Sequence, residues 1–242
     1  HFFKRFVKKA TRIITISEYS KADISSFYKV DAQKIDNVSC GISSNFKPLS
    51  NDAIKSIRDK WSNGKPYFFF IGSMHPRKNI KRLIEGYNLF RAQYKTDIKL
   101  LLGGSILWSK SEIEDSYINS PHKDDIIFTG RLSDADLQDL LGAAFALSFV
   151  PIFEGFGLPI VEAMQSDIPV ICSNVTSMPE VGGDAVLYAD PFDVKSIAAA
   201  MERMIAEPGL REALIEKGRK QKEKFSWDNT AMLFWNSIQK AL

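Results

Sequence analysis

Two glutamates stand eight positions apart around a turn-forming segment, "EGFGLPIVE", which begins at Glu154 and ends at Glu162. Pro159 suits the first turn of a helix, so Glu162 is expected about one turn inside that helix. Gly155 and Gly157 let the backbone approach a ligand, and the unpaired N–H groups of a helix start favour an anion such as a diphosphate. A carboxylate inside the helix would repel phosphate, but it can accept hydrogen bonds from sugar hydroxyls. The pattern fits a nucleotide-sugar, with Glu154 on the sugar and Glu162 on the ribose.

A second segment, "IGSMHPRKN", places Arg77 and Lys78 before another expected helix. Positive charge at a helix start opposes the helix dipole, so anion binding explains this pair better than capping does. Both segments follow apolar, strand-like runs, and ligands of open parallel sheets bind beyond the carboxyl ends of the strands. Two anion sites at one sheet edge suit a diphosphate. The alternative is a set of solvated loop and helix-surface residues with no ligand.

The elements that position these loops are predicted from hydrophobic patterning. Continuous apolar runs indicate strands covered on both faces. The segment 79–93 has helical spacing behind Asn79 as its cap, and Ser133 with an acid three positions on forms a capping box. This alternation from about 65 to 190 predicts a doubly wound α/β sheet. The expected strands are 12–17, 37–40, 67–72, 98–104, 125–130, 145–151, 168–174 and 185–190.

Composition excludes several classes of protein. The 242 residues are 45% hydrophobic and 25% charged, which is typical of a globular protein with a sizeable core. The formal charge of +3 argues against a nucleic-acid partner. Cys40 and Cys172 have no metal-ligand spacing, so a disulfide framework and a zinc site are not expected, and a reducing cytosol is the simplest setting. No apolar run reaches the roughly 18 residues that span a bilayer, so a soluble or at most peripheral protein is expected.

Other motifs have a structural interpretation beside a functional one. Asp134-x-Asp136 resembles a metal-binding D-x-D, but it also belongs to the predicted capping box. Gly103 and Gly104 follow a strand without the lysine of a P-loop or the spacing of a dinucleotide fingerprint. The start of the chain, "FFKRFVKKATR", could be a membrane-surface helix, although a domain helix with an apolar side is the favoured interpretation.

At this point the sequence resembles a known family. "EGFGLPIVEAM" matches the E-x7-E signature of retaining glycosyltransferases of the GT-B fold. "IGSMHPRKN", "FTGRLSDADLQDLL" and "SNVTSMPEVGGDAVLYADPFD" resemble successive segments of glycosyltransferase family 4, particularly the mannosyltransferase-like members that build bacterial polysaccharides. The resemblance spans about residues 11–240. It implies a truncated acceptor-binding domain at 1–42, a connector at 43–64, a Rossmann-like donor-binding domain at 65–225, and a helix at 226–242 that packs back on the first domain.

The resemblance also implies an activity. The expected reaction moves a hexose, with mannose favoured, from a nucleotide-sugar to a saccharide or lipid-linked acceptor with retention of configuration. GDP-mannose is the favoured donor and a UDP-sugar the second candidate, with no metal or other cofactor. The expected location is the cytoplasm, with peripheral contact at the inner face of the plasma membrane as a further expectation. A non-catalytic nucleotide-sugar binding module and a GT-B-fold epimerase are the alternatives.

The site residues carried over from the resemblance fall into two groups. Glu154, Lys78 and Arg77 are expected to act in catalysis, on the hexose and the diphosphate. Many members have an arginine where this chain has Ser73, so the grip on the diphosphate is expected to rest more on Arg77 and Lys78. Glu180 belongs to a turn that lies near the donor in the family. The expected donor-binding residues are Glu162, Gly72, Ser73, Gly155, Phe156, Gly157, Leu158, Gly130 and Arg131.

Overall fold

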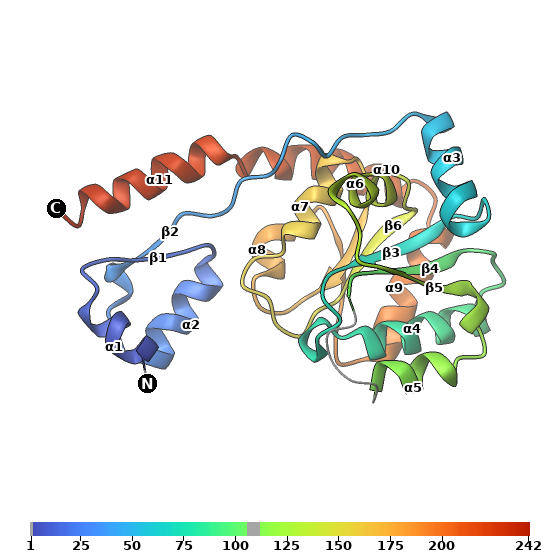
Figure 1. Cartoon of the computed structure of the whole chain (residues 1–242), viewed down its shortest axis with the longest axis horizontal. Helices are drawn as coiled ribbons and strands as arrows, with labels where there is room; N and C mark the ends of the chain where they lie inside the picture. The colour runs from blue at the N-terminus through green and yellow to red at the C-terminus, as the bar shows by residue number, and fades with distance from the viewer. Residues whose placement is uncertain (1, 106–111) are drawn as a thin grey trace.

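A computed structural model of the chain describes residues 2–105 and 112–242. The first part forms a small unit that lies at one end of the molecule, apart from the larger sheet (Figure 1). Its strands pair in parallel, with Ile13 opposite Ile35. The strand predicted at 37–40 lies at Ile35–Asn37 instead, because it pairs along Ile13–Thr15. The elements of this unit are α1 (Phe2–Lys9), β1 (Ile13–Thr15), α2 (Glu18–Tyr28) and β2 (Ile35–Asn37).

The larger unit is built on a six-stranded sheet in which all neighbouring strands are parallel. The strand order is β5-β4-β3-β6-β7-β8. Strands β4, β6 and β7 are buried along their whole length, which explains their continuous apolar sequences. The strands are β3 (Tyr67–Ile71), β4 (Lys99–Gly103), β5 (Ile126–Gly130), β6 (Ala146–Phe149), β7 (Val170–Ser173) and β8 (Leu187–Ala189).

Helices cover both faces of this sheet, which confirms the predicted doubly wound α/β fold (Figure 1). Helix α4 packs against α5 and α9 on one face, and α7 packs against α10 on the other. Helix α3, which precedes the sheet, packs against α6. The helices are α3 (Asn51–Ser62), α4 (Ile80–Gln93), α5 (Glu112–Ile118), α6 (Asp134–Gly142), α7 (Leu158–Gln165), α8 (Met178–Gly182), α9 (Val194–Ala206), α10 (Leu210–Gln221) and α11 (Trp227–Gln239).

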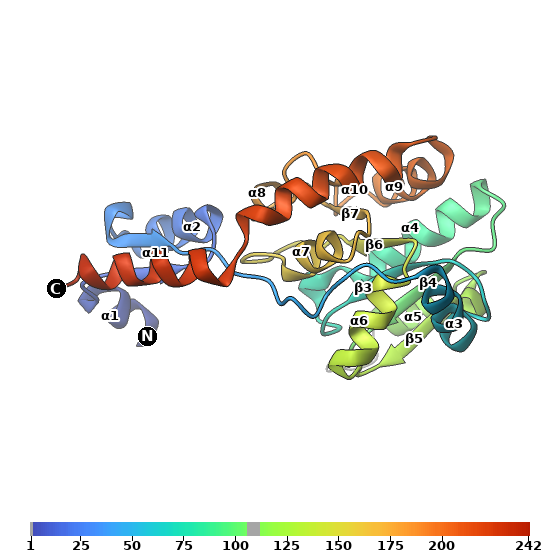
Figure 2. The same ribbon diagram turned by 90° about the horizontal axis from the view of Figure 1, so that it is seen from above.

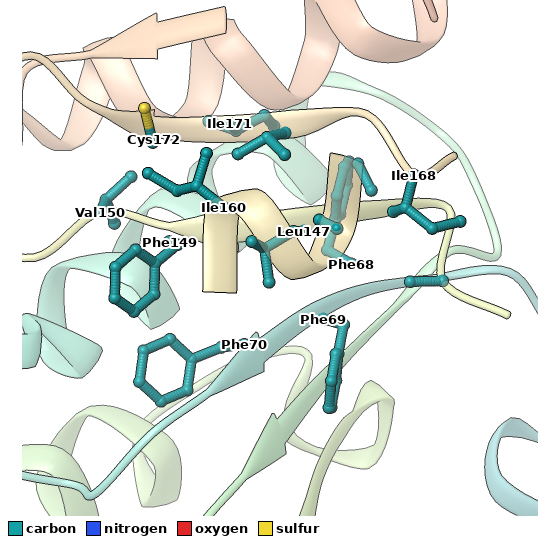
Figure 3. Packing of buried hydrophobic residues seen from close by; sticks show 14 of the residues in the cluster. Phe68, Phe69, Phe70, Leu147, Phe149, Val150, Ile160, Ile168, Ile171 and Cys172 are labelled. Atoms are coloured by element: carbon teal, nitrogen blue, oxygen red, sulfur yellow. The ribbon is translucent and has the colours of Figure 1, made fainter. Parts of the chain in front are cut away.

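Strand β3 carries the centre of the hydrophobic core. Phe68, Phe69 and Phe70 have no exposed surface. The ring of Phe70 stacks on that of Phe149 in β6, with 6.2 Å between centroids and an interplanar angle of 18° (Figure 3). Full burial of one such side chain contributes about 1.5–3 kcal/mol. These contacts hold β3 and β6 side by side, so the loops after the two strands share one edge of the sheet.

The chain crosses twice between the two units. The first crossing contains Gly41 and the second contains Trp227. The two segments lie in close contact, since a Cβ atom added at Gly41 would lie only 2.4 Å from the backbone nitrogen of Trp227. Helix α11 then runs beside the small unit (Figure 2). There Ser237 Oγ donates to Asp36 at 2.7 Å, and Nζ of Lys240 lies 2.9 Å from the same carboxylate.

Of the two predicted helix caps, one is confirmed and one is wrong. Ser133 accepts a hydrogen bond from the backbone at the start of α6, as predicted, and Ser226 caps α11 in the same way. Asn79 precedes α4 with φ of 63°, and its side chain makes no capping hydrogen bond. Its Nδ2 donates to the carbonyls of Val150 (3.0 Å) and Pro191 (2.7 Å). Buried polar groups need partners, and these bonds fix the side-chain amide. Its Oδ1, the atom that would cap the helix, instead accepts from the guanidinium of Arg82 at 3.2 Å.

Candidate functional site

The loops after β3 and β6 meet at the point where the strand order reverses. Strands β3 and β6 are neighbours in the sheet, and the chain leaves β3 towards β4 but leaves β6 towards β7. In open α/β sheets ligands bind in the crevice at this switch point. One backbone hydrogen bond joins the two loops directly, from Ile152 N to the carbonyl of Arg77 at 2.8 Å.

Lys78, Arg77 and Glu154 form a single ion-pair cluster at this switch point. Nζ of Lys78 lies 2.5 Å from Oε1 of Glu154, and the Arg77 guanidinium contacts the same oxygen. The Lys78 side chain is 10% exposed, and its Nζ lies 4.8 Å from the centre of the Phe149 ring. Two cations thus share one carboxylate, with Lys78 and Glu154 largely buried and Arg77 41% exposed. The excess positive charge favours a further anion.

Gly72 allows the lysine to lie against the backbone. Its φ of 151° is unfavourable for any residue with a side chain, and an added Cβ would lie 3.3 Å from Cε of Lys78. The carbonyl of Ser73 accepts a hydrogen bond from the backbone of His75 at 2.8 Å. The 3₁₀ turn Pro76–Lys78 follows, closed by a hydrogen bond from Lys78 N to the His75 carbonyl at 2.8 Å, and it carries the two basic residues before α4. Gly72 and Ser73 are therefore part of the same loop as Lys78.

The turn before α7 offers free backbone donors. Gly157 precedes the helix with φ of 113° and gives no side-chain cap. In the part of the chain that the structure describes, the backbone N–H groups of residues 155–158 have no hydrogen-bond partner. Such groups at a helix start, with the positive end of the helix dipole, bind anions. Because Glu154 begins this turn, the free amides lie beside the ion-pair cluster.

Glu162 lies one turn inside α7 and is partly buried. Burial raises the pKa of its carboxyl to about 7. Within residues 2–105 and 112–242, no hydrogen bond or ion pair reaches this carboxyl, and none joins it to Lys78 or Glu154. A partly buried acid without a protein partner is typical of a ligand-binding position.

Gly130 and Arg131 lie at the end of β5, which is separated from β3 and the cluster by β4. The carbonyl of Gly130, at the end of β5, accepts a hydrogen bond from Gly104 N at 2.9 Å. Gly104 in turn lies against the carbonyl of Gly72. Arg131 is exposed and makes no ion pair within the described residues. The ends of β3, β4 and β5 thus form one continuous edge, and Arg131 does not contact the Lys78 cluster.

Three serines that sequence reasoning missed hold the turn in place. Ser177 Oγ donates to the carbonyls of Glu154 (3.0 Å) and Phe156 (2.9 Å). Ser17 and Ser20 of the small unit donate to the carbonyl of Gly155, at 2.6 and 3.2 Å. The only local signal was the helix cap at Ser17, which gives no hint of a contact across 138 residues.

The carboxylate of Glu180 is hydrogen-bonded to other groups of the protein. Its carboxylate accepts hydrogen bonds from the backbone of Glu18 (2.9 Å to each oxygen) and of Tyr19 (3.3 Å). The Asn37 side chain donates a further bond at 3.2 Å. The expectation that its turn serves the donor directly therefore does not extend to this carboxylate.

The D-x-D motif and the apolar start of the chain have no role in the cluster of Lys78, Arg77 and Glu154. Asp136 of the D-x-D motif accepts a hydrogen bond from Ser133 Oγ at 2.7 Å and pairs with Lys60 at 3.4 Å. Across the described residues, no three His, Cys, Asp or Glu side chains cluster as metal ligands would. Phe3 and Phe6 of α1 are exposed. Among the helices that the structure describes, none is long and apolar enough to cross a membrane.

Comparison with known proteins gives consistent results. Residues 53–221 match the family described as Glycosyl transferases group 1. O-antigen chain mannosyltransferase B of Escherichia coli is 35% identical over 221 residues, which cover 91% of this chain and 58% of that protein. The O-antigen chain mannosyltransferase RfbU of Salmonella typhimurium is 27% identical over 233 residues, which cover 96% of this chain and 61% of that protein. This chain thus spans about three fifths of these relatives.

A solved structure resembles the whole fold. HepE of Anabaena, determined in complex with UDP and glucose, superposes with a TM-score of 0.86 at 16% identity. The alignment covers 97% of this chain and 64% of that one. At this identity the likeness establishes the fold, including the placement of a small unit beside a larger parallel sheet.

Proposed function

The chain belongs to the group 1 glycosyltransferases, and on this premise we propose that it is the donor-binding part of a retaining mannosyltransferase. The proposed donor is GDP-mannose, with a UDP-sugar as the second candidate. The identity to O-antigen chain mannosyltransferase B supports mannose. The observation that carries the proposal is the Lys78–Arg77–Glu154 cluster beside the amides at the start of α7, which find no partner within residues 2–105 and 112–242.

In this proposal the diphosphate binds between the two loops. Lys78 and Arg77 supply positive charge from the β3 loop, and the N–H groups of residues 155–158 supply donors from the β6 loop. A charge-assisted hydrogen bond of this kind contributes about 1.5–3 kcal/mol. The same groups stabilise the negative charge that develops on the leaving diphosphate as the glycosidic bond breaks. No metal is part of the proposal, because these groups carry out the charge neutralisation.

The two glutamates bind the sugars on either side of the diphosphate. Glu154 stands among the cations and accepts hydrogen bonds from hexose hydroxyls once phosphate replaces it on Lys78. Glu162, which has no partner among the described residues, accepts hydrogen bonds from the ribose hydroxyls. The bond between the hexose C1 and the diphosphate breaks through an oxocarbenium-like state. An acceptor hydroxyl attacks C1 on the face that the diphosphate leaves and gives its proton to the departing diphosphate, which retains the configuration. The acceptor is proposed to be a saccharide or a lipid-linked saccharide bound by the rest of the protein.

Donor binding is tested by titrating the chain with GDP-, UDP-, ADP- and dTDP-sugars in the presence of EDTA, with thermal stability as the readout. The proposal expects GDP-mannose to raise the melting temperature most, without metal. The proposal is contradicted if every nucleotide-sugar raises the melting temperature equally, or if none raises it.

The alternatives need the full-length protein. A transferase forms product only when an acceptor is present, an epimerase forms product without one, and a binding module forms none. Retention is tested by the anomeric configuration of the product in NMR. An inverted product contradicts the proposed mechanism even if mannose is transferred.

A further inference from the structure

Polar contacts join the small unit to the donor-site turn. Helix α2 has no fully buried residue, so apolar burial does not fix it in place. Ser17 and Ser20 at its start instead donate to the carbonyl of Gly155, across more than 130 residues of sequence. The ring of Tyr19 adds an edge-to-face contact with Phe153, at 6.0 Å between centroids.

Glu180 forms the second half of this junction. The first N–H groups of a helix have no partner within the helix, and a carboxylate binds them with the help of the helix dipole. The N–H groups of Glu18 and Tyr19 both donate to Glu180, a residue of the larger unit. The next N–H group, that of Ser20, donates to Ser17 Oγ at 3.0 Å. The start of α2 is thus completed by a side chain from the other unit.

We propose that Ser17, Ser20 and Glu180 form an interdomain clasp that positions the donor-binding turn Glu154–Gly157. This inference rests on the proposed function of that turn. The three side chains are positioning residues, because each acts through the backbone of the turn or of α2 and none is proposed to touch the substrate.

The reason that the clasp matters lies in the peptide units of the turn. Serine hydroxyls from α2 and from Ser177 hold three successive carbonyls, those of residues 154–156. Each peptide unit is planar, so fixing a carbonyl also fixes the N–H group on its opposite side. The clasp thereby fixes the N–H group of Phe156, and Ser177 fixes the N–H groups on either side of it. In this proposal the three amides face the diphosphate together. The clasp also makes the shape of this site depend on the position of the small unit.

A ligand-free measurement tests the clasp itself. Amide hydrogen exchange at Glu18 and Tyr19 should become at least about tenfold faster in Glu180→Ala, because both amides lose their acceptor. The matched control is Asp184→Ala, since that acid of the larger unit is 79% exposed, pairs with Lys217 and takes no part in these bonds. Unchanged exchange in Glu180→Ala overturns the inference.

A binding measurement tests the positioning role. Ser20→Ala should weaken GDP-mannose binding to the chain about 3- to 10-fold, the usual effect of losing one hydrogen bond. Ser20→Thr keeps the hydroxyl and should restore the affinity. The matched control Ser25→Ala removes a similar bond within the small unit, to the Val30 carbonyl at 2.8 Å, and should leave the affinity unchanged.

The outcomes separate this inference from the proposed function. If the wild-type chain binds no nucleotide-sugar, the proposed function fails, and hydrogen exchange still judges the clasp. If the wild type binds GDP-mannose and Ser20→Ala binds equally well, the positioning role is overturned while the donor site stands. A threonine variant as weak as the alanine variant also overturns it, because the hydroxyl is then not what matters.

Discussion

Replacing Glu162 by glutamine should stabilise the protein at pH 8 while it weakens donor binding. Burial raises the pKa of this carboxyl from its usual 4.5 to about 7. The unfolded chain therefore releases the proton near pH 4.5, and the folded chain keeps it until about pH 7. Between these values the folded state binds more protons, so stability falls as the pH rises. Glutamine does not ionise, so it contributes no such change of stability with pH.

The size of the effect follows from the difference in pKa. Each pKa unit corresponds to about 1.4 kcal/mol, so the ionised carboxyl destabilises the fold by about 3 kcal/mol above pH 7 at most. Because Glu162 is only partly buried, solvent reduces this figure. We expect Glu162→Gln to gain about 1–2.5 kcal/mol relative to the wild type between pH 5 and pH 8.

The assay is urea unfolding of wild type and variant at both pH values, with Glu202→Gln, an exposed residue of α9, as the matched control. The control should show the same difference from wild type at pH 5 and pH 8. Titration with GDP-mannose should show weaker binding by Glu162→Gln, because a neutral amide accepts hydrogen bonds from ribose less strongly than a carboxylate. An equal stability difference at the two pH values would refute the burial argument.

Three further perturbations have expected outcomes. Glu154→Gln frees Lys78 and Arg77, so calorimetry should show GDP binding about 3- to 10-fold tighter, without an equal gain for GDP-mannose; weaker GDP binding would contradict the shared anion site. Burial opposes ionisation of Asp36, but hydrogen bonds from Arg12 and two residues of the C-terminal segment outweigh it and hold its pKa well below the usual range. Asp36→Asn should therefore lower the free energy of unfolding by about 1–3 kcal/mol at pH 7 and by much less once the pH falls below the native pKa of Asp36, as urea unfolding at pH 7 and under strongly acidic conditions would check. Gly72→Ala should lower the melting temperature, because alanine is strained at φ of 151°; an unchanged melting temperature would mean that the loop adjusts.

Local sequence patterns predicted the sheet because its strands are buried on both faces. "YFFFI" in β3 and "VICS" in β7 have no polar alternation, a pattern typical of strands covered on both faces of a parallel sheet. The convergence of the loops at Lys78 and Glu154 followed from the rule that ligands bind at the carboxyl edge of such a sheet. These predictions depend on short-range periodicity and on topology, both of which a sequence contains.

The contacts between the two units could not be predicted in this way. The local sequence predicts a helix cap at Ser17 and an exposed acid at Glu180, near a glycine-rich turn. Their bonds to Gly155 and to the start of α2 depend on how the small unit is placed against the larger one. Asn79 shows the same limit at shorter range, because its amide serves two loop carbonyls that are distant in sequence. No local pattern encodes a partner more than 70 residues away.

The most direct test of the donor site is calorimetric titration of GDP-mannose, in EDTA, into the wild type and Lys78→Met. Lys81→Met, on the exposed side of α4, is the matched control. The buried lysine is proposed to contact the diphosphate, so its loss should weaken binding about 10- to 100-fold, while the control binds like the wild type. Equal affinity of Lys78→Met and the wild type would contradict the proposed site.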